Sequence, residues 1–248
     1  MTIATFRSDL FAGKVALVVG GTTGIGAGIA NAFAALGAVV TVTGATAEEC
    51  AAARAAQGFR CRAAVAVDVR DAVAVARLVE GLPRLDVLVN CAGIIRRGAE
   101  HEVAVFEEVL AINLTGTMRT CTLAREKLKA AGGAIVNTAS VLSFFGGGLV
   151  PGYAASKGGV AQLTKSLAIA YAPDGIRVNA LAPGWVDTPL TKALREDPQR
   201  NAAIIGRTPL GRWAEPSDIA GAAVFLCSPA ARFITGAVLP VDGGYMIA

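Results

Sequence analysis

The chain has 248 residues, of which 54% are hydrophobic and 17% are charged, and its formal net charge is +4. This balance excludes a disordered protein, and the length suits one large α/β domain with a substantial core. The Lys and Arg residues are dispersed, so no cluster indicates a nucleic-acid partner. No apolar run is long and uninterrupted enough to predict a membrane span.

Cysteine and histidine usage argues against disulfides and metal sites. The chain has five cysteines, none of them in CxxC spacing, and a single histidine, His101. We therefore expect reduced thiols, no metal and a cytoplasmic protein. The first 13 residues lack the basic-then-apolar pattern of a signal peptide.

Short β-branched apolar runs alternate with alanine-rich stretches along the chain. The predicted strands are Val15–Val19, Val39–Thr43, Ala63–Val67, Val87–Val89, Ala134–Thr138, Arg177–Leu181 and Ala237–Pro240. The predicted helical regions are Ile25–Leu36, Glu48–Gln57, Ala72–Glu80, Val103–Ala131, Tyr153–Tyr171 and Pro216–Leu226. This alternation predicts a doubly wound parallel sheet with helices on both faces. No linker or repeat divides the chain, so a single domain over 1–248 is expected.

A glycine-rich turn, Gly20-Gly21-Thr22-Thr23-Gly24-Ile25-Gly26, follows the first predicted strand and precedes a helix. This order is the expected context for dinucleotide binding. Glycines let the backbone approach a pyrophosphate closely, and the helix N-terminus offers free N–H groups to the phosphates. A purely structural turn is the alternative interpretation.

Polar residues and glycines follow three later strands. Asp68 ends the third strand, Asn90-Cys91-Ala92-Gly93 ends the fourth, and Pro183-Gly184 follows the sixth. Ligands of open α/β sheets bind beyond the carboxyl ends of the strands. The common placement of these residues therefore predicts a site at that edge.

Tyr153 and Lys157 lie one turn apart on one face of a predicted helix. A cation about 4 Å from a phenol is worth roughly 4 kcal/mol, or about three pKa units. We therefore expect Lys157 to lower the pKa of Tyr153 toward neutrality, where general acid–base catalysis is most effective.

The motifs occur in the order Gly20-xxx-Gly24-Ile25-Gly26, Asn90-Cys91-Ala92-Gly93, Asn113, Ser140, Tyr153-xxx-Lys157 and Pro183-Gly184. With these motifs the whole chain resembles the short-chain dehydrogenase/reductase family. The resemblance implies a Rossmann fold of about seven strands, an oxidoreductase acting on CH–OH groups, a nicotinamide cofactor and a homotetramer. Two residues depart from the common pattern of the family: Val19 stands where many members have threonine, and Cys91 where many have a second asparagine. Neither difference removes a reacting group.

The resemblance also implies a role for each of four catalytic residues. Tyr153 exchanges a proton with the substrate oxygen, and Ser140 hydrogen-bonds the same oxygen. Lys157 holds the nicotinamide ribose, and Asn113 supports a water that relays protons. The expected cofactor-binding residues are Gly20, Thr22, Thr23, Gly24, Ile25, Gly26, Gly44, Ala45, Asp68, Val69, Asn90, Ala92, Gly93, Tyr153, Lys157, Pro183, Gly184, Val186 and Thr188.

The second predicted strand ends in Thr43-Gly44-Ala45-Thr46. This turn has neither an acidic residue for a ribose 2′-OH nor an arginine for a 2′-phosphate. Thr23 also lacks the basic side chain of many NADP-dependent relatives. Without a cation to offset a phosphate, NAD is the expected cofactor, and NADP stays open.

Residues 90–97, 140–147 and 211–213 resemble the branch of the family that acts on sugar acids such as 2-deoxy-D-gluconate or 2-keto-3-deoxygluconate. The expected substrate residues are Arg96, Ser140, Tyr153 and Trp185. Arg97, Arg207 or Arg212 are further candidates to hold a carboxylate, and each could instead be solvated or paired between subunits.

Two other functions stay open at this point. A 3-oxoacyl-(acyl-carrier-protein) reductase uses the same scaffold, and a non-catalytic NAD-sensing regulator is the alternative from another class. Residues 185–212 are expected to form a lid over a small-molecule substrate. The apolar residues 241–248 are expected to pack against a neighbouring subunit.

Overall fold

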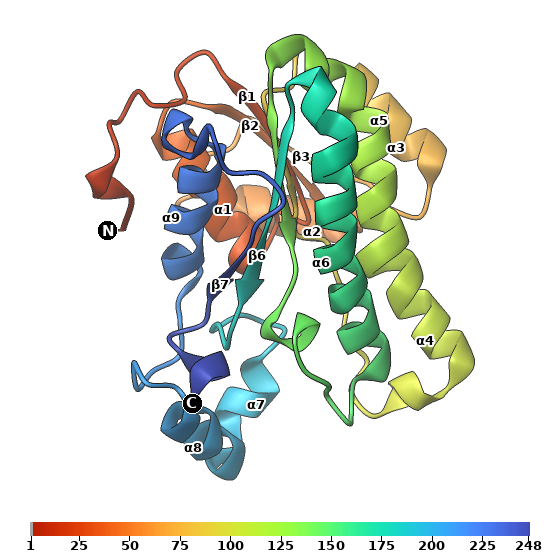
Figure 1. The fold of residues 1–248 in the computed structure, drawn as a ribbon, viewed down its shortest axis with the longest axis vertical. Coiled ribbons are helices and arrows are strands. Elements are labelled where there is room, and N and C mark those ends of the chain that lie inside the picture. Colours follow the sequence, from red (N-terminus) through yellow and green to blue (C-terminus); the bar gives the residue numbers. More distant parts are fainter. Residues whose placement is uncertain (1) are drawn as a thin grey trace.

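Seven parallel strands form one sheet at the centre of the molecule (Figure 1). The computed structural model describes residues 2–248, and the strand order is β3-β2-β1-β4-β5-β6-β7. The strands are β1 (Val15–Val19), β2 (Val39–Gly44), β3 (Ala63–Ala66), β4 (Val87–Asn90), β5 (Ala134–Thr138), β6 (Arg177–Pro183) and β7 (Val238–Val241). Every neighbouring pair is parallel, so the predicted doubly wound Rossmann sheet is confirmed.

Helices connect the strands and cover both faces of the sheet. They are α1 (Gly24–Ala35), α2 (Ala47–Ala55), α3 (Ala72–Glu80), α4 (Val103–Leu110), α5 (Gly116–Ala131), α6 (Pro151–Tyr171), α7 (Lys192–Glu196), α8 (Pro198–Arg207) and α9 (Pro216–Cys227). The apolar pattern does not predict α7 and α8, because both are short and largely polar. The start of α8 does carry a local signal, since the Asp197 side chain accepts from two N–H groups of its first turn and Pro198 follows it.

The long helical region predicted over 103–131 is interrupted. A π-helical turn, Ala111–Thr115, separates α4 from α5. Such turns are rare and occur frequently at functional sites. This one contains Asn113.

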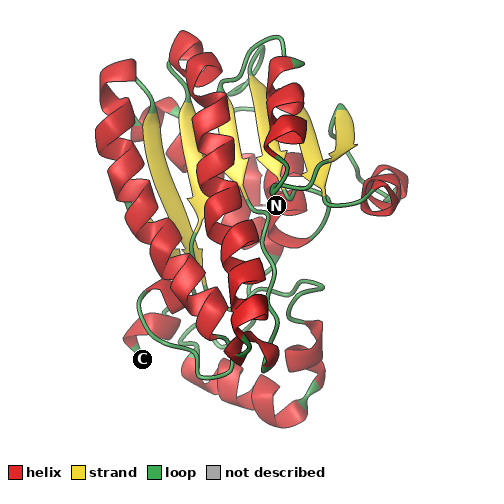
Figure 2. Cartoon of the chain, turned by 90° about the vertical axis from the view of Figure 1, so that its right-hand side faces the viewer, coloured by secondary structure: helices red, strands yellow, loops and turns green. Residues whose placement is uncertain are grey.

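Alternation along β1 divides the core into two layers. Ala16 and Val18 pack toward α1 and α9, whereas Leu17 and Val19 pack toward α5 and α6. Figure 1 shows these helices on opposite sides of the sheet, and Figure 2 faces the layer that contains α6. Because the strands are buried on both faces, their sequences are continuously apolar.

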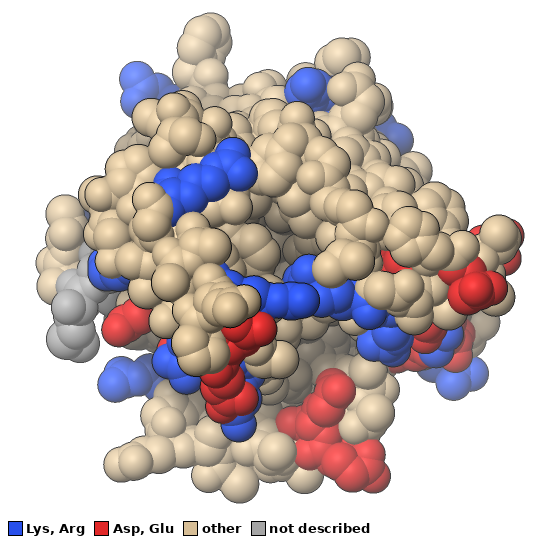
Figure 3. All heavy atoms as spheres, turned by 90° about the horizontal axis from the view of Figure 1, so that it is seen from below, with Lys and Arg blue, Asp and Glu red and all other residues tan. Residues whose placement is uncertain are grey.

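The topological switch point lies between β1 and β4, because the chain builds β2 and β3 on one side of β1 and the later strands on the other. Helices α7 and α8 lie beyond the carboxyl ends of the strands, at the lower end of Figure 1. Figure 3 looks onto this end, whose surface is hollowed near its centre with Lys and Arg side chains beside the hollow.

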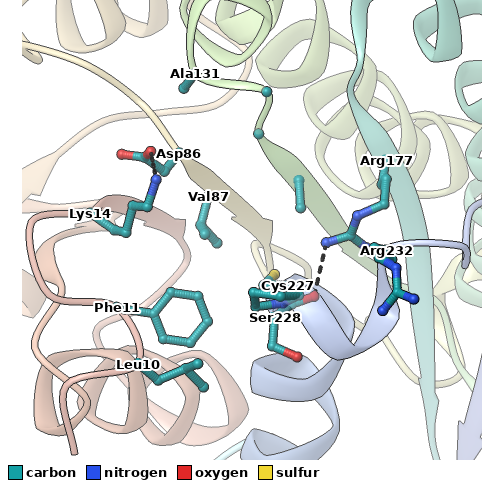
Figure 4. A pocket seen from close by; sticks show the side chains of 14 residues that line it. Leu10, Phe11, Lys14, Asp86, Val87, Ala131, Arg177, Cys227, Ser228 and Arg232 are labelled. Carbon is teal, nitrogen blue, oxygen red and sulfur yellow. Dashed lines mark hydrogen bonds and ion pairs between the residues drawn. The ribbon is translucent and has the colours of Figure 1, made fainter.

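A cavity of about 280 Å³ lies at the opposite, amino edge of the sheet (Figure 4). Lys14 donates to Asp86 at 3.1 Å, and Arg177 donates to the Ser228 carbonyl at 3.4 Å. These charged groups are paired, and the predicted catalytic residues lie at the other edge. The cavity is therefore not the candidate active site. None of the helices between residues 2 and 248 combines the length and apolarity needed to cross a membrane.

Candidate active site

The glycine-rich turn joins β1 to α1 with an unusually close approach of backbone segments. Gly20 has φ +75° and Gly24 has φ +54°, in the left-handed region that favours glycine. A Cβ on Gly20 would lie 2.5 Å from Ala92 N, and one on Gly26 would lie 2.1 Å from Gly20 O. The Thr23 side chain does not cap α1, so the first N–H groups of this helix are available to phosphates. The turn therefore fits a dinucleotide.

Segments that are distant in sequence meet at this turn. A Cβ on Gly24 would lie 3.2 Å from Thr188 Cγ2. A Cβ on Gly93 would lie 3.3 Å from Asn113 Oδ1 and 3.7 Å from Lys157 Nζ. The fold thus brings the glycine-rich turn, the loop after β4, the π-helical turn, α6 and the segment after β6 into one crevice.

Asn113 is fully buried and holds the loop after β4. Its Oδ1 accepts from Ile94 N at 2.8 Å, and its Nδ2 donates to Ile94 O at 3.0 Å and to Ser156 Oγ at 3.1 Å. Both N–H groups of the amide are therefore used to fix this loop against α6.

Tyr153 and Lys157 lie on one face of α6, as their spacing predicts. Lys157 Nζ lies 5.6 Å from the centre of the Tyr153 ring and donates to the Thr138 carbonyl at 2.6 Å. Ser140 follows β5 by two residues and lines the same cavity as Tyr153. The hydroxyl, phenol and ammonium groups predicted to act at the substrate are thus close together.

The pKa of the Tyr153 phenol is raised, not lowered as expected. Burial is the main cause, the Ser140 hydroxyl opposes it, and the charge of Glu100 adds to it. Burial also lowers the pKa of Lys157 to about 8. The expected direction was wrong because burial removes water from the phenolate, and this loss of hydration outweighs the effects that lower the pKa. Tyr153 is therefore protonated at neutral pH and can donate to a substrate oxygen.

Arg97 lines the cavity beside Ser140 and Tyr153. Burial and the positive charge of Arg200, in α8, lower the pKa of Arg97. The Arg97 guanidinium beside this cavity favours an anionic ligand, while Arg200 pairs with Asp197 at 3.5 Å. The sequence pattern did not single out Arg200, because only the fold brings α8 to the site.

The other candidate arginines are engaged elsewhere. Arg96 pairs with Glu108, with 3.6 Å between Nε and Oε2. Arg212 makes a two-pronged contact with Asp218 at 2.7 and 3.0 Å. Arg207 lies over two aromatic rings, 4.4 and 5.5 Å from their centres. Arg96 therefore does not line the cavity of Ser140 and Tyr153, whereas its neighbour Arg97 does.

The segment 185–212 is joined at its ends beside the crevice. Ala214 N donates to Trp185 O at 2.9 Å, and Asp187 N donates to Ala214 O at 2.8 Å. The Trp185 ring packs edge-on against Trp213 and Tyr245. Its indole N–H is buried and has no hydrogen-bond partner within residues 2–248.

Two predicted cofactor residues have side chains engaged elsewhere. Asp68 makes a two-pronged ion pair with Arg70, and this hydrogen bonding lowers the pKa of Asp68. Asn90 is buried, where it donates to Asn137 Oδ1 at 2.9 Å and accepts from Thr120 at 2.7 Å. Its amide therefore ties β4 to β5 and α5.

The remaining predicted cofactor residues lie at the carboxyl ends of the strands. They are Thr22 and Ile25 in the glycine-rich turn, Gly44 at the end of β2 and Ala45 after it, Val69 after β3, Pro183 at the end of β6, and Gly184 and Val186 after it.

Glu49 is a candidate that the sequence pattern missed. Its Oε2 accepts from Ala45 N at 2.7 Å and lies 3.0 Å from where a Cβ on Gly44 would stand. The carboxylate therefore lies at the end of β2, where no acidic residue was expected. The Thr46 side chain accepts from Glu49 N at 3.2 Å, and the three-residue spacing between them is typical of helix capping. This spacing is the local signal by which the sequence could have identified Glu49.

No group of three or more His, Cys, Asp or Glu side chains in the described chain is arranged to hold a metal ion. His101 is exposed, with its Nε2 2.9 Å from the Gly148 carbonyl oxygen. Cys91 accepts from the Thr138 hydroxyl at 3.2 Å. These side chains therefore have local structural contacts.

Known proteins with the same architecture match nearly the whole chain. Residues 19–246 match the family model described as enoyl-(acyl carrier protein) reductase. The 2-dehydro-3-deoxy-D-gluconate 5-dehydrogenase of Pseudoalteromonas atlantica is 43% identical over 250 residues, covering 94% of this chain and 96% of the relative. The galactitol 2-dehydrogenase (L-tagatose-forming) of Cereibacter sphaeroides is 42% identical over 256 residues, covering 98% and 97%.

A solved structure agrees in fold. The proposed NAD(P)-dependent gluconate 5-dehydrogenase of Beutenbergia cavernae, crystallised with NADP at low occupancy, has a TM-score of 0.88 and 42% identity. The match covers 97% of this chain and 100% of that protein. Together with the glycine-rich turn and the Tyr153–Lys157 pair, these matches confirm the expected family. The chain belongs to the short-chain dehydrogenase/reductase family of NAD(P)-dependent oxidoreductases that act on CH–OH groups.

Proposed function

We propose that the protein interconverts a secondary hydroxyl and a ketone on a small sugar acid, such as 2-deoxy-D-gluconate or 2-keto-3-deoxygluconate. One observation carries this proposal: the guanidinium of Arg97 lines the same cavity as Ser140 and Tyr153. A carboxylate bound there would leave a hydroxyl further along the carbon chain beside the phenol. The named activity of the Pseudoalteromonas atlantica relative supports the same substrate class.

The proposed roles of the side chains follow from their protonation and contacts. Tyr153 donates a proton to the ketone oxygen in reduction and accepts one in oxidation. Ser140 stabilises charge on that oxygen. Lys157, whose pKa is about 8, binds the nicotinamide ribose and passes protons to Tyr153. Asn113 keeps the loop after β4 in place. The bound nicotinamide supplies or accepts the hydride.

We propose NAD as the preferred cofactor. The Glu49 carboxylate at the end of β2 supports this preference, because an acidic group there accepts from a ribose 2′-OH and repels a 2′-phosphate. The end of β2 therefore carries a carboxylate, although the turn of residues 43–46 is itself uncharged.

Glu49→Gln tests the preference. The variant removes one negative charge but keeps an oxygen for the Ala45 N–H. We expect kcat/KM for NADP to rise about 5- to 50-fold, because the repulsion of the 2′-phosphate falls at this surface position. Glu48→Gln is the matched control, since Glu48 does not contact Ala45, and its NAD/NADP ratio should stay within about twofold of wild type. A wild-type protein that prefers NADP would contradict the assignment.

We propose that residues 185–212 form the substrate lid. Trp185, Leu190 and Thr191 of this segment line the same cavity as Ser140 and Tyr153, so the segment borders the space in which a substrate would bind. The buried indole N–H of Trp185, which has no hydrogen-bond partner within residues 2–248, is a donor that this substrate could use.

A screen of purified protein against sugar acids, neutral polyols and acyl thioesters, each with NAD(H) and NADP(H), tests the proposed function. Turnover of a sugar acid at least about tenfold more efficient than that of a neutral polyol is expected, because the carboxylate contact is charge-assisted. Preferred turnover of a 3-oxoacyl thioester would select the acyl-carrier-protein alternative. Absence of turnover with every substrate, together with NAD binding, would select the regulator.

We propose a homotetramer in the cytoplasm. Ile169 on α6 is 78% exposed and Phe233 is 101% exposed, and such apolar side chains favour contact with another subunit. The C-terminal residues fit this only in part, since Tyr245 packs on Trp185 of its own chain while Ile247 is 90% exposed. Sedimentation velocity should give about four times the 25.1 kDa chain mass, and a monomer would contradict this proposal.

The cysteines of the described chain are all unpaired, which fits the reducing compartment proposed for the protein.

A further inference from the structure

Glu100 is a carboxylic acid buried where carboxylates are rare. Its side chain is 1% exposed, and it belongs to the short 3₁₀ turn Ala99–His101 before α4. In Figure 1 this segment lies beside the lower end of α6. A buried carboxylate is costly unless hydrogen bonds satisfy it, so its partners indicate its role.

Both oxygens of Glu100 bind backbone N–H groups that belong to the site. Oε2 accepts from the N–H of Tyr153 at 2.7 Å, and Oε1 accepts from the N–H of Arg96 at 2.8 Å. The Glu100 N–H in turn donates to the Arg96 carbonyl at 3.2 Å. One side chain therefore joins the turn that carries Arg97 to the residue that carries the phenol.

The N-terminus of α6 needs such an acceptor from elsewhere in the chain. The N-cap residue, Val150, has no side-chain acceptor, and Pro151 follows it without an N–H. A carboxylate at this end also matches the helix dipole. Gly152 leaves the room, because a Cβ there would lie 3.3 Å from Glu100 Oε2 and 3.2 Å from a ring carbon of Phe106.

We propose that Glu100 is a positioning residue that links the Arg97 turn to the start of α6 and so fixes the separation between the carboxylate-binding guanidinium and the Tyr153 phenol. This inference rests on the proposed sugar-acid function for its kinetic consequences. The link itself is a property of the fold and can be tested without any substrate.

The charges around the link give it a second, electrostatic consequence. The Glu100 charge acts on Arg97 and on the Tyr153 phenol, Lys157 Nζ lies 5.6 Å from the centre of the Tyr153 ring, and Glu108 on α4 is paired with Arg96. The negative charge of Glu100 raises the pKa of Tyr153. Removing that charge therefore lowers this pKa, and the rise of the oxidation rate with pH moves to lower pH.

The experiment compares Glu100→Gln, Glu100→Asp and the matched control Glu102→Gln, whose exposed side chain does not cap the helix it precedes. In Glu100→Gln the NH₂ group cannot accept, so one of the two backbone N–H groups loses its partner. Amide hydrogen exchange at Tyr153 or Arg96 should quicken about tenfold or more. With a sugar acid, kcat should fall about 10- to 100-fold and KM should rise, because a displacement near 1 Å costs this much.

The other readouts separate positioning from general stability. Glu100→Gln should move the alkaline rise of the oxidation profile to lower pH and leave cofactor Kd within about twofold, because the glycine-rich turn is untouched. Glu100→Asp keeps the charge without the reach, so it should keep the wild-type pH profile with a low kcat. Glu102→Gln should match wild type throughout. Wild-type kcat, KM and pH profile in Glu100→Gln, or a lower melting temperature as the only change, would overturn the proposal.

Two further arms keep the outcome decisive. If Glu100→Gln does not fold, Gly152→Ala replaces it, because the added methyl group crowds the same carboxylate. This variant should raise the amide exchange rate at Tyr153 and lower kcat, as Glu100→Gln is expected to do. Wild-type exchange and kcat in Gly152→Ala would refute the link. If wild type turns over no sugar acid, the proposed function fails, and the exchange comparison still supports or refutes the link.

Discussion

Tyr153→Phe is expected to lower kcat by about 10²- to 10⁴-fold while cofactor Kd changes less than about threefold, the range measured for loss of a general acid–base group. The phenol is half-buried beside Ser140, its pKa is raised by burial, and it is protonated at neutral pH. Its replacement removes the proton and leaves the ring in place. Steady-state kinetics with a sugar acid, and a fluorescence titration with NADH, measure the two quantities.

Tyr171→Phe is the matched control for this variant. Tyr171 lies at the other end of α6, where it packs under Arg125, 4.5 Å from the ring centre, and far from the glycine-rich turn. The kcat of Tyr171→Phe should stay within about twofold of wild type, because the Tyr171 ring packs against neighbouring side chains and is not expected to take part in the reaction. A Tyr153→Phe enzyme with a near-normal rate would remove Tyr153 from the proton transfer.

Arg97→Ala is expected to reduce kcat/KM for a sugar acid by roughly 10- to 100-fold, because a charge-assisted contact worth about 1.5–3 kcal/mol is lost. Most of the effect should be in KM, since the carboxylate is bound equally in the ground state and the transition state. Turnover of a neutral polyol by the same variant should change little. Arg97→Lys should recover only part of the loss, because a lysine cannot make the two-pronged contact.

Two other arginines make this prediction specific. Arg232→Ala removes the same charge from an exposed position at the amino edge of the sheet, and it should leave kcat/KM for the acid unaltered. Arg96→Ala distinguishes the neighbouring candidates, since Arg96 pairs with Glu108 and does not line the cavity. A larger loss in Arg96→Ala than in Arg97→Ala would reverse the assignment.

Local sequence predicted the fold well where the physical signal is local. Apolar strands buried on both faces, alanine-rich helices and a glycine-rich turn all have short-range signatures, and each is present in the structure. The helix α3 has the predicted bounds, Ala72–Glu80, because the Asp71 side chain caps its first turn. The helices α7 and α8 carry few apolar residues, of which Leu194 and Ile204 are buried, so the apolar signal over them is short.

The chemistry of the site was only partly predictable. The spacing of Tyr153 and Lys157 placed both on one face of α6, but it could not give the pKa direction, which depends on how much water the fold removes. Composition could not separate Arg96 from Arg97, because the turn directs one side chain to Glu108 and the other to the cavity.

The sequence by itself determined the parallel sheet, the glycine-rich turn and the shared helix face of Tyr153 and Lys157, because backbone geometry and helical spacing act over a few residues. Only the tertiary structure decided which charges meet. It brought Arg200 near Arg97, and the Glu100 carboxylate to the start of α6. Electrostatic interactions and burial depend on distance in space, and partners separated by tens of residues acquire that distance only when the chain folds.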